Sequence, residues 1–340
     1  MNKKLDQIIQ EIFPEAVMDY SAWQSVLDQC KNHSVFHLFS TVRYFVSYFL
    51  QSESINLSMV LYNRDIAVGV MPLMIHKNEH QEWVLSSNGI EIVEPVFIER
   101  LSHKYKKNLE SKLYNLIENL SESLEISQCK FVNMDYIQLS SWYLMCSERA
   151  KEAFSTYHSI VDLSLSVDEI HLRFRRSYKT LINKGLREWN VEIHEQVSDK
   201  LFEKFRLLHK KASGGSTRPI ESWQEQKRQI DSCEAILITV SDKYENLVGA
   251  GFFTYSKYQG LYCVAAYERD LFNKPLGHAI QMKIIETLKD KGVVWYEIGQ
   301  KHLNIDRSQA TDKELSISHF KEGFATHVIA RQHLLVDFSL

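Results

Sequence analysis

Two stretches of the chain show the same order of apolar and polar positions. In each stretch, three short apolar runs are separated by polar turns, and the middle run contains a Val-Gly pair. Such runs predict β-strands, because strands are short, rich in Val, Ile and aromatic residues, and bounded by turn residues. The predicted strands are residues 57–61, 66–73 and 83–85 in the first stretch and 235–240, 247–253 and 261–265 in the second.

A segment with helical periodicity follows each group of strands. Large aliphatic residues recur every three or four positions over residues 104–122 and again over residues 276–288. This spacing places them on one face of a helix. A further strand is predicted after each helix, at residues 129–134 and 293–298.

The repeated order of elements predicts two copies of one domain. Each copy has its strands before its helix, which favours an α+β fold over the regular alternation of a doubly wound sheet. We place the boundary within residues 149–155, so the predicted domains are residues 1–152 and 153–340. Each is expected to be a mixed, mostly antiparallel sheet flanked by helices.

The composition is that of a globular chain and excludes several classes of function. The 340 residues are 44% hydrophobic and 24% charged, which is ordinary for soluble domains. Lys and Arg number 40 against 43 Asp and Glu, for a formal net charge of -3. Because general nucleic-acid binding needs a basic excess, we expect no DNA partner.

Membrane, secretion and metal signals are also missing from the sequence. No apolar run reaches the ~20 residues that span a bilayer, and the first ten residues lack the apolar core of a secretory signal. The five cysteines are scattered without a CxxC pair, which indicates neither a disulfide framework nor a zinc site. We therefore expect a cytoplasmic protein with reduced thiols and no metal.

Residues 173–187 predict a helix with one strongly basic face. They contain six positive side chains and no carboxylate. At helical spacing, Arg173, Arg176 and Lys184 fall opposite an apolar stripe. Guanidinium groups are planar forked donors that suit phosphate. The alternative is a solvated helix face that pairs with acidic neighbours.

The junction at residues 274–279 is a second candidate site. Lys274, Gly277 and Ala279 open the predicted helix, where a glycine permits close approach of a ligand and free amides attract an anion. The alternative is that Gly277 only permits close packing behind a common first-turn proline. His278 lies in the same junction and is a candidate general base with a pKa near working pH.

Two further candidates lie near the C-terminus. Glu297, in the last predicted strand, either polarises an amine or water or faces solvent. Lys321 lies between Phe320 and Phe324, and these residues alone favour core anchors with a lysine that reaches water. No HExxH, GxSxG or GxxxxGK[ST] motif occurs, so zincin, serine-hydrolase and P-loop functions have no support.

Taken in order, these segments resemble the FemAB-like branch of the GNAT acyltransferase superfamily over residues 30–338. The resemblance is carried by the paired Val-Gly strands, the junction 160–164 with its basic helix, the run 267–299, and the sequence HFKEGF at 319–324. It implies two tandem GNAT-like domains. It also implies transfer of an acyl or aminoacyl group to an amine, often on a nucleotide- or lipid-linked sugar.

The resemblance also implies roles for particular residues, with the reaction site in the second domain. Arg173, Arg176 and Lys184 would contact substrate phosphates, and Lys321 would stabilise developing negative charge or bind a phosphate. The pyrophosphate of coenzyme A would lie at Lys274, Gly277 and Ala279, although Gln or Arg is more usual at the first position. Backbone amides of strand 263–265, which includes Val264, would donate to the oxyanion, and Tyr267 would contact the substrate.

One segment departs from the family pattern. Some tRNA-dependent members carry a long coiled-coil arm in the second domain, whereas residues 200–232 here are short and irregular, with glycines and a proline inside them. This difference disfavours transfer RNA as a partner. The polar and aromatic loop 216–223, with Arg218 and Trp223, either lines the acceptor site or is a surface connection.

We therefore expect an N-acyltransferase that uses a coenzyme A thioester, acetyl-CoA or another acyl-CoA, as co-substrate. The expected acceptor is a phosphorylated or nucleotide-linked amine, such as an amino sugar of a polysaccharide or cell-wall precursor, with His278 or Glu297 as base. Two alternatives stay open: an aminoacyl-tRNA-dependent transferase, and a non-catalytic binding or scaffold protein. Peripheral contact with a membrane and the oligomeric state also stay open.

Overall fold

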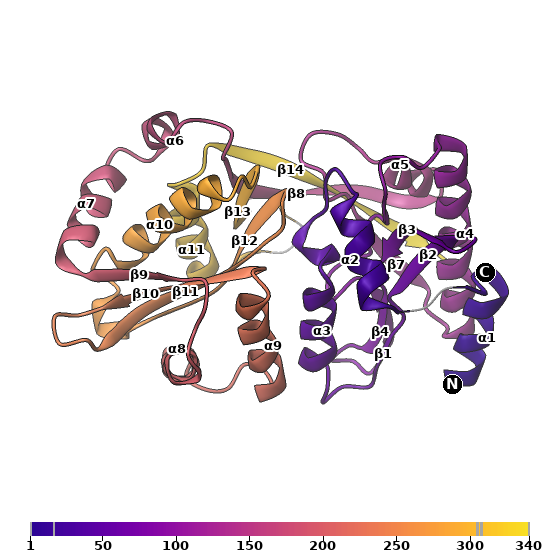
Figure 1. Cartoon of the computed structure of the whole chain (residues 1–340), viewed down its shortest axis with the longest axis horizontal. Helices are drawn as coiled ribbons and strands as arrows, with labels where there is room; N and C mark the ends of the chain where they lie inside the picture. The colour runs from indigo at the N-terminus through magenta and orange to yellow at the C-terminus, as the bar shows by residue number, and fades with distance from the viewer. Residues whose placement is uncertain (1, 16–17, 304–305, 307–308, 339–340) are drawn as a thin grey trace. The chain divides into compact units, whose positions relative to one another are not determined.

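The computed structural model describes residues 2–15, 18–303, 306 and 309–338, which form two compact units (Figure 1). Unit 1 consists of the chain up to Ser155 together with the stretch from Arg331 onward, and unit 2 consists of residues 156–330. The last strand therefore returns to unit 1. The linear pattern, which assigned everything after residue 152 to one domain, did not indicate this return.

Unit 1 is built from short strands with helices around them. Its helices are α1 (Asn2–Ile12), α2 (Tyr20–Asp28), η1 (Val35–His37), α3 (Phe39–Tyr48), α4 (His103–Ser123) and α5 (Ser141–Ser147). Its strands are β1 (Ser54–Asn56), β2 (Met59–Asn63), β3 (Ile66–Met71), β4 (Met74–Lys77), β5 (Trp83–Ser86), β6 (Val96–Phe97) and β7 (Gln128–Val132). They form the sheets β1-β4-β5 and β2-β3-β6, while β7 pairs with the end of β14 (His327–Asp337).

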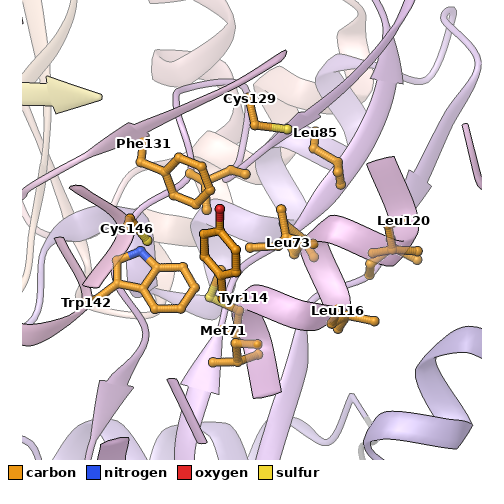
Figure 2. Packing of buried hydrophobic residues seen from close by; sticks show 14 of the residues in the cluster. Met71, Leu73, Leu85, Tyr114, Leu116, Leu120, Cys129, Phe131, Trp142 and Cys146 are labelled. Carbon is orange, nitrogen blue, oxygen red and sulfur yellow. The ribbon is translucent and has the colours of Figure 1, made fainter. Parts of the chain in front are cut away.

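The core of unit 1 lies around the apolar face of α4. Figure 2 shows the Tyr114 ring of α4 beside Phe131 of β7 and Trp142 of α5, and Tyr114 and Phe131 stack at 6.3 Å between ring centroids. Leu116 and Leu120 of the same helix are fully buried. The helical spacing of residues 104–122 is thus confirmed, because the recurring leucines are the buried ones.

Unit 2 contains one sheet with helices on both faces. Its helices are α6 (Val167–Arg173), α7 (Tyr178–Glu188), α8 (Asp199–Ser213), α9 (Ile220–Asp231), η2 (Arg269–Leu271), α10 (Leu276–Asp290) and α11 (Asp312–Glu322). Its strands are the end of β8 (Ala150–Asp162), β9 (Asn190–His194), β10 (Ala235–Ser241), β11 (Leu247–Tyr255), β12 (Gln259–Tyr267) and β13 (Trp295–Lys301). They lie in the order β8-β13-β12-β11-β10-β9, and every pair is antiparallel except β12 with β13.

The sheet of unit 2 buries a separate apolar cluster on each face. In Figure 1, α7 and α10 lie on one side of the sheet and α8 and α9 on the other. The cluster on the α10 side includes Phe253, Ile284 and Tyr296, and the cluster on the α8–α9 side includes Phe205 and Phe252. Phe252 and Phe253 point to opposite faces because successive side chains of a strand alternate.

One predicted element differs from the structure. The single basic helix expected over residues 173–187 is wrong, because α6 ends at Arg173 and α7 begins only at Tyr178. Phe174 is extended and buried against Phe324, and the Arg175 N–H donates to the Gly323 carbonyl at 2.9 Å. These tertiary contacts interrupt the helix. The segment 200–232, described only as too short and irregular for a coiled-coil arm, contains α8 and α9 on either side of its glycines and proline.

Candidate active site

The parallel strands β12 and β13 pair over only three residues. Residues 259–261 pair with residues 295–297, and no further pair of these strands follows along the described chain. Directly beyond, β12 bulges at Cys263 where it faces β11, and β13 shifts register against β8 between Glu297 and Gly299. We call the region where the pairing stops, bounded by residues 262–267 and 298–301, the β12–β13 split.

Glu297 lies at the mouth of this split and is held by two donors. Its side chain is only 5% exposed. One carboxylate oxygen accepts from His158 Nδ1 of β8 at 2.7 Å, and the other accepts from Gln259 Nε2 of β12 at 3.1 Å. His158 Nε2 lies 2.9 Å from Thr156 Oγ1. Because a buried carboxylate without partners is costly, these bonds make an ionised Glu297 tolerable there.

Lys321 extends from α11 into the same region. Its ammonium lies 5.4 Å from the ring centroid of Tyr262, and it occupies the space that a side chain at Gly299 would need. Gly299 has φ +143°, a backbone conformation that favours glycine. Burial lowers the pKa of Lys321, and the nearby Glu297 carboxylate opposes that effect. The split therefore holds a carboxylate and an ammonium that influence each other.

The carboxylate faces the α8–α9 side of the sheet. Tyr296 and Ile298, the neighbours of Glu297 in β13, belong to the cluster on the α10 side, so Glu297 points the other way. Cys263, the extra residue of the β12 bulge, is exposed, and its Sγ lies 3.1 Å from Thr254 Oγ1. The opening of the split thus carries Glu297 and a thiol on one side of the sheet.

The predicted anion junction at the start of α10 is tightly packed. A Cβ at Gly277 would lie 3.0 Å from Phe320 and 3.1 Å from the Tyr267 hydroxyl. One at Gly185 of α7 would lie 2.7 Å from the Pro275 carbonyl and 3.1 Å from Ala279. Both glycines therefore permit close packing. The helix itself has no side-chain cap at Pro275, which leaves its first amides without a capping group.

His278 is enclosed by aromatic rings. The ring centroids of Tyr178, Phe320 and Phe324 lie 4.5, 5.2 and 5.6 Å from that of the imidazole. Its Nε2 is buried without a hydrogen-bond partner. Burial, helped by the Arg175 charge, lowers the pKa of His278 to about 4. The imidazole is therefore neutral at pH 7 and a weak base.

The predicted phosphate contacts line the exposed side of α6 and α7. Arg173, Arg176 and Lys184 are all exposed, and Arg173 Nη1 lies 3.4 Å from His327 Nε2. Lys184 precedes the glycine that packs on Pro275, and the exposed Lys274 precedes that proline. Cationic side chains from two segments therefore border the start of α10.

Three predicted residues lie elsewhere. Trp223 is buried among Phe202 and Phe205 on the α8–α9 side, with the Arg218 guanidinium 4.3 Å above its ring, and Val264 belongs to the same cluster. Tyr267 lies on the α10 side, where its hydroxyl is 3.1 Å from that of Tyr262. The structure thus places Lys321 beside Gly299, two residues after Glu297 in β13, whereas it gives Trp223 and Val264 buried positions in the core.

Sequence reasoning missed His158, Gln259, Thr156 and Gly299. Nothing local connects His158 with Glu297, because they meet only through the pairing of β8 with β13. Gly299 follows Glu297 by two residues and was the one available signal, since a glycine inside a strand often marks a bulge or a close approach.

The described residues show neither a metal site nor a membrane-spanning helix. They contain no group of three or more His, Cys, Asp or Glu that could hold a metal ion. Within the same part of the chain, no helix has both the length and the apolar character needed to cross a membrane.

Solved structures show what this fold is similar to. FemX matches with a TM-score of 0.67 at 11% identity, over 93% of this chain and 96% of that one. L-PGS from Bacillus licheniformis matches with 0.61 at 13% identity, over 95% and 93%. The C-terminal domain of a putative lysylphosphatidylglycerol synthetase from Agrobacterium fabrum matches with 0.58 at 11% identity, over 93% and 92%. No family model and no curated protein matches the chain.

These neighbours agree with the resemblance drawn from the motifs. The likeness extends over nearly the whole length of both chains. The expected mixed α+β class is confirmed. The chain therefore has a fold like that of FemX and of the lysylphosphatidylglycerol synthetase domains.

Proposed function

We propose that this chain transfers an acyl group from an activated donor to an amine at the β12–β13 split. The observation that carries the proposal is the buried Glu297 carboxylate, held by two donors, with the Lys321 ammonium beside Gly299 two residues further along β13. Acyl transfer to an amine needs a group that removes a proton and a group that stabilises negative charge. Glu297 suits the first role and Lys321 the second.

The proposed reaction balances with these two groups. The neutral amine attacks the acyl carbonyl, its C–N bond forms, and the oxyanion of the adduct is stabilised by Lys321 and by backbone amides near Val264. Glu297 takes a proton from the adduct nitrogen. The bond to the leaving group then breaks, Lys321 gives that group a proton, and Glu297 returns its proton to Lys321. Burial assists this exchange, because it lowers the pKa of Lys321 and makes the ammonium a stronger acid.

Glu297 is a better candidate for the base than His278. The imidazole has its pKa lowered to about 4, and aromatic rings surround it. Its surroundings suit a packing role, in which it supports α7 and α11 beside α10. We therefore assign His278 to positioning of these helices, Lys274 to the donor side of the site, and Gly277 and Ala279 to the close packing that shapes the start of α10.

The exposed cations favour a donor that carries phosphate groups. Lys184 and Lys274 border the start of α10, whose first amides have no side-chain cap, and Arg176 is exposed just before α7. Guanidinium and ammonium groups beside a helix N-terminus suit phosphate. A coenzyme A thioester has such groups, and we keep it as the first candidate donor. The acceptor would be a phosphorylated or nucleotide-linked amine on the α8–α9 side, near Arg218.

A second candidate donor is aminoacyl-tRNA. The whole-length similarity to FemX and L-PGS favours it, since a lysylphosphatidylglycerol synthetase is named for a product that carries a lysyl group. Both donors bring an activated acyl carbon and phosphate groups to the site. They differ in the number of phosphate contacts, and therefore in how steeply binding falls with salt.

The test offers purified protein acetyl-CoA or charged tRNA together with a panel of nucleotide-linked amino sugars, and product is followed by mass spectrometry. Lys321→Ala should reduce kcat about 100-fold or more, because it removes a charge donor to the oxyanion. Lys313→Ala, at an exposed lysine of the same helix, should have no effect. If neither donor binds or reacts, or if Lys321→Ala is as active as the parent protein, the proposal fails and a binding role takes its place.

A further inference from the structure

We infer that His158 is a positioning residue for Glu297 in the proposed reaction. The inference rests on the proposed function, and it adds a residue that no sequence motif indicates. His158 donates one hydrogen bond to the carboxylate and thereby fixes its orientation, while Gln259 fixes it from the opposite strand. Thr156 in turn holds the imidazole.

The strand register explains how these groups meet. Glu297 of β13 pairs with Ile160 of β8. His158 lies two residues before Ile160, so its side chain is on the same face of the sheet as Glu297, as a diagonal neighbour. Beyond Glu297 the register shifts, and Gln300 rather than Gly299 pairs with His158. The irregular pairing brings the imidazole against the carboxylate at 2.7 Å.

The hydrogen bonds also determine which imidazole nitrogen carries the proton. An ionised carboxylate only accepts, so His158 Nδ1 must be the N–H that faces Glu297. In the neutral imidazole, Nε2 then accepts from the Thr156 hydroxyl at 2.9 Å. If the ring becomes charged, the hydroxyl needs only to rotate and accept. The Glu297 contact therefore stays in place in both protonation states of His158.

This contact matters because Glu297 has lost most of its water. With 5% of its side chain exposed, the ionised form depends on the N–H groups of His158 and Gln259. Among the described residues, Lys321 from α11 and Cys263 from β12 are further titratable groups that interact with it. Lys321 is needed at the adduct, and the thiol is not a donor of comparable strength. His158, whose contact is the shorter of the two, and Gln259 therefore hold the base ready.

Two substitutions separate this role from simple packing. In His158→Asn, the side-chain amide places an N–H close to the position of Nδ1 and cannot titrate. In His158→Phe, the ring is kept and the donor is lost. We expect His158→Phe to reduce kcat about 10- to 100-fold with KM nearly unchanged, the loss typical of one hydrogen bond to a charged group. We expect His158→Asn to stay within about 5-fold of the parent protein.

The pH profile gives a readout that packing alone would not change. Loss of the N–H donor disfavours the ionised carboxylate, so the acidic limb of kcat against pH should move to higher pH in His158→Phe and not in His158→Asn. His80→Phe, at an exposed histidine of unit 1, serves as the control for adding an aromatic ring. Equal rates and equal profiles for His158→Phe and the parent protein would overturn the inference.

A spectroscopic measurement tests the contact independently of turnover. With ¹⁵N-labelled histidine, the His158 ring should appear as the Nδ1–H tautomer in the parent protein at a pH where it is neutral. A His158 ring protonated at Nε2 instead would overturn the inference, whatever the rates. If the parent protein shows no transfer with any donor, the proposed function fails and the positioning role fails with it, while an Nδ1–H signal would still establish the His158–Glu297 pair as structural.

Discussion

The two units repeat one order of elements, but they differ where the strand after the long helix meets its parallel neighbour. In unit 1, Ile92 pairs with β7: its N–H donates to Lys130 at 2.9 Å, and its carbonyl accepts from Val132 at 3.0 Å. The Glu94 carboxylate then accepts from the Met134 N–H at 3.1 Å. In unit 2, the pairing of β12 with β13 stops at residues 261 and 297.

The helices that precede these strands also differ, in whether a side chain caps their first turn. In unit 1, the Ser102 hydroxyl accepts from the Tyr105 N–H at 3.3 Å and caps α4. In unit 2, Pro275 precedes α10 without a side-chain cap. The corresponding region therefore has its strands paired and its helix capped in unit 1. In unit 2 the strand pairing stops early and the helix has no side-chain cap. The two regions thus differ in the hydrogen bonding of their backbone and not in the order of their elements.

The largest effect should come from Gly299→Ala in the β12–β13 split. The added methyl group would occupy the place of the Lys321 ammonium, at a backbone conformation that favours glycine. We expect the transfer rate to fall about 100-fold, as for loss of one charge donor to the oxyanion, and stability to fall by about 1 kcal/mol. Rates and thermal unfolding measure the two effects.

Gly292→Ala is the matched control for Gly299→Ala. Gly292 also has a positive φ, +74°, but a Cβ there would meet no atom within 4 Å. It should lose stability without losing rate. If both variants keep the parent rate, transfer does not depend on the position of Lys321. The difference in strand pairing between the two units would then have no consequence for the reaction.

Glu94→Gln tests the region of unit 1 in which Ile92 pairs with β7. Burial raises the pKa of Glu94 to about 7, against an ordinary value of 4.5. Between these values the folded state binds more protons than the unfolded state, so this group contributes stability below pH 4.5 that is lost as pH rises to about 7. Glu94→Gln should lack that loss, which amounts to about 2–3 kcal/mol.

Urea unfolding at pH 4.5 and pH 7.5 measures this difference. The buried His37 has its pKa lowered to about 4 and acts in the opposite direction, so the comparison is between variant and parent at each pH. Glu79→Gln, at an exposed glutamate, should leave the pH dependence as it is. A parent protein whose stability rises from pH 4.5 to 7.5 by the same amount as that of Glu94→Gln would contradict the prediction.

His278→Phe tests the packing around the open helix start in unit 2. Because the folded-state pKa of His278 is lowered to about 4, the unfolded chain binds the proton first, and this group reduces stability as pH falls from 6.5 to about 4. The variant should unfold less readily at pH 4.5 than the parent, by about 1–2 kcal/mol, and equally at pH 7.5. If His278→Phe is no more stable than the parent protein at pH 4.5, the imidazole is solvated in the folded state and the prediction is wrong.

The smallest effect should come from Ser102→Ala at the capped helix start. Loss of an N-cap side chain costs about 1 kcal/mol. Ser177→Ala is the matched control, because Ser177 precedes α7 but makes no side-chain cap. Chemical denaturation should show the loss for Ser102→Ala alone. Equal stability of the two variants would remove the cap as a difference between the units.

Much of the fold was predictable because the spacing of apolar residues over a short segment indicates whether that segment is a helix or a strand. The strands around the two Val-Gly pairs and the helices α4 and α10 lie where apolar spacing indicated them. Glu297 and Lys321 could be singled out by motif. Their meeting could not, since it depends on the packing of α11 against β13 and on a glycine that leaves room for the lysine.

By itself, therefore, the sequence determined the kinds of element, their order and the mixed α+β class, because helical and strand periodicities act over a few residues. Tertiary structure decided the break between α6 and α7, the return of residues 331–338 to unit 1, and the contact of His158 with Glu297. Each of these depends on hydrogen bonds or burial between residues far apart in the chain, and no short-range pattern encodes such partners.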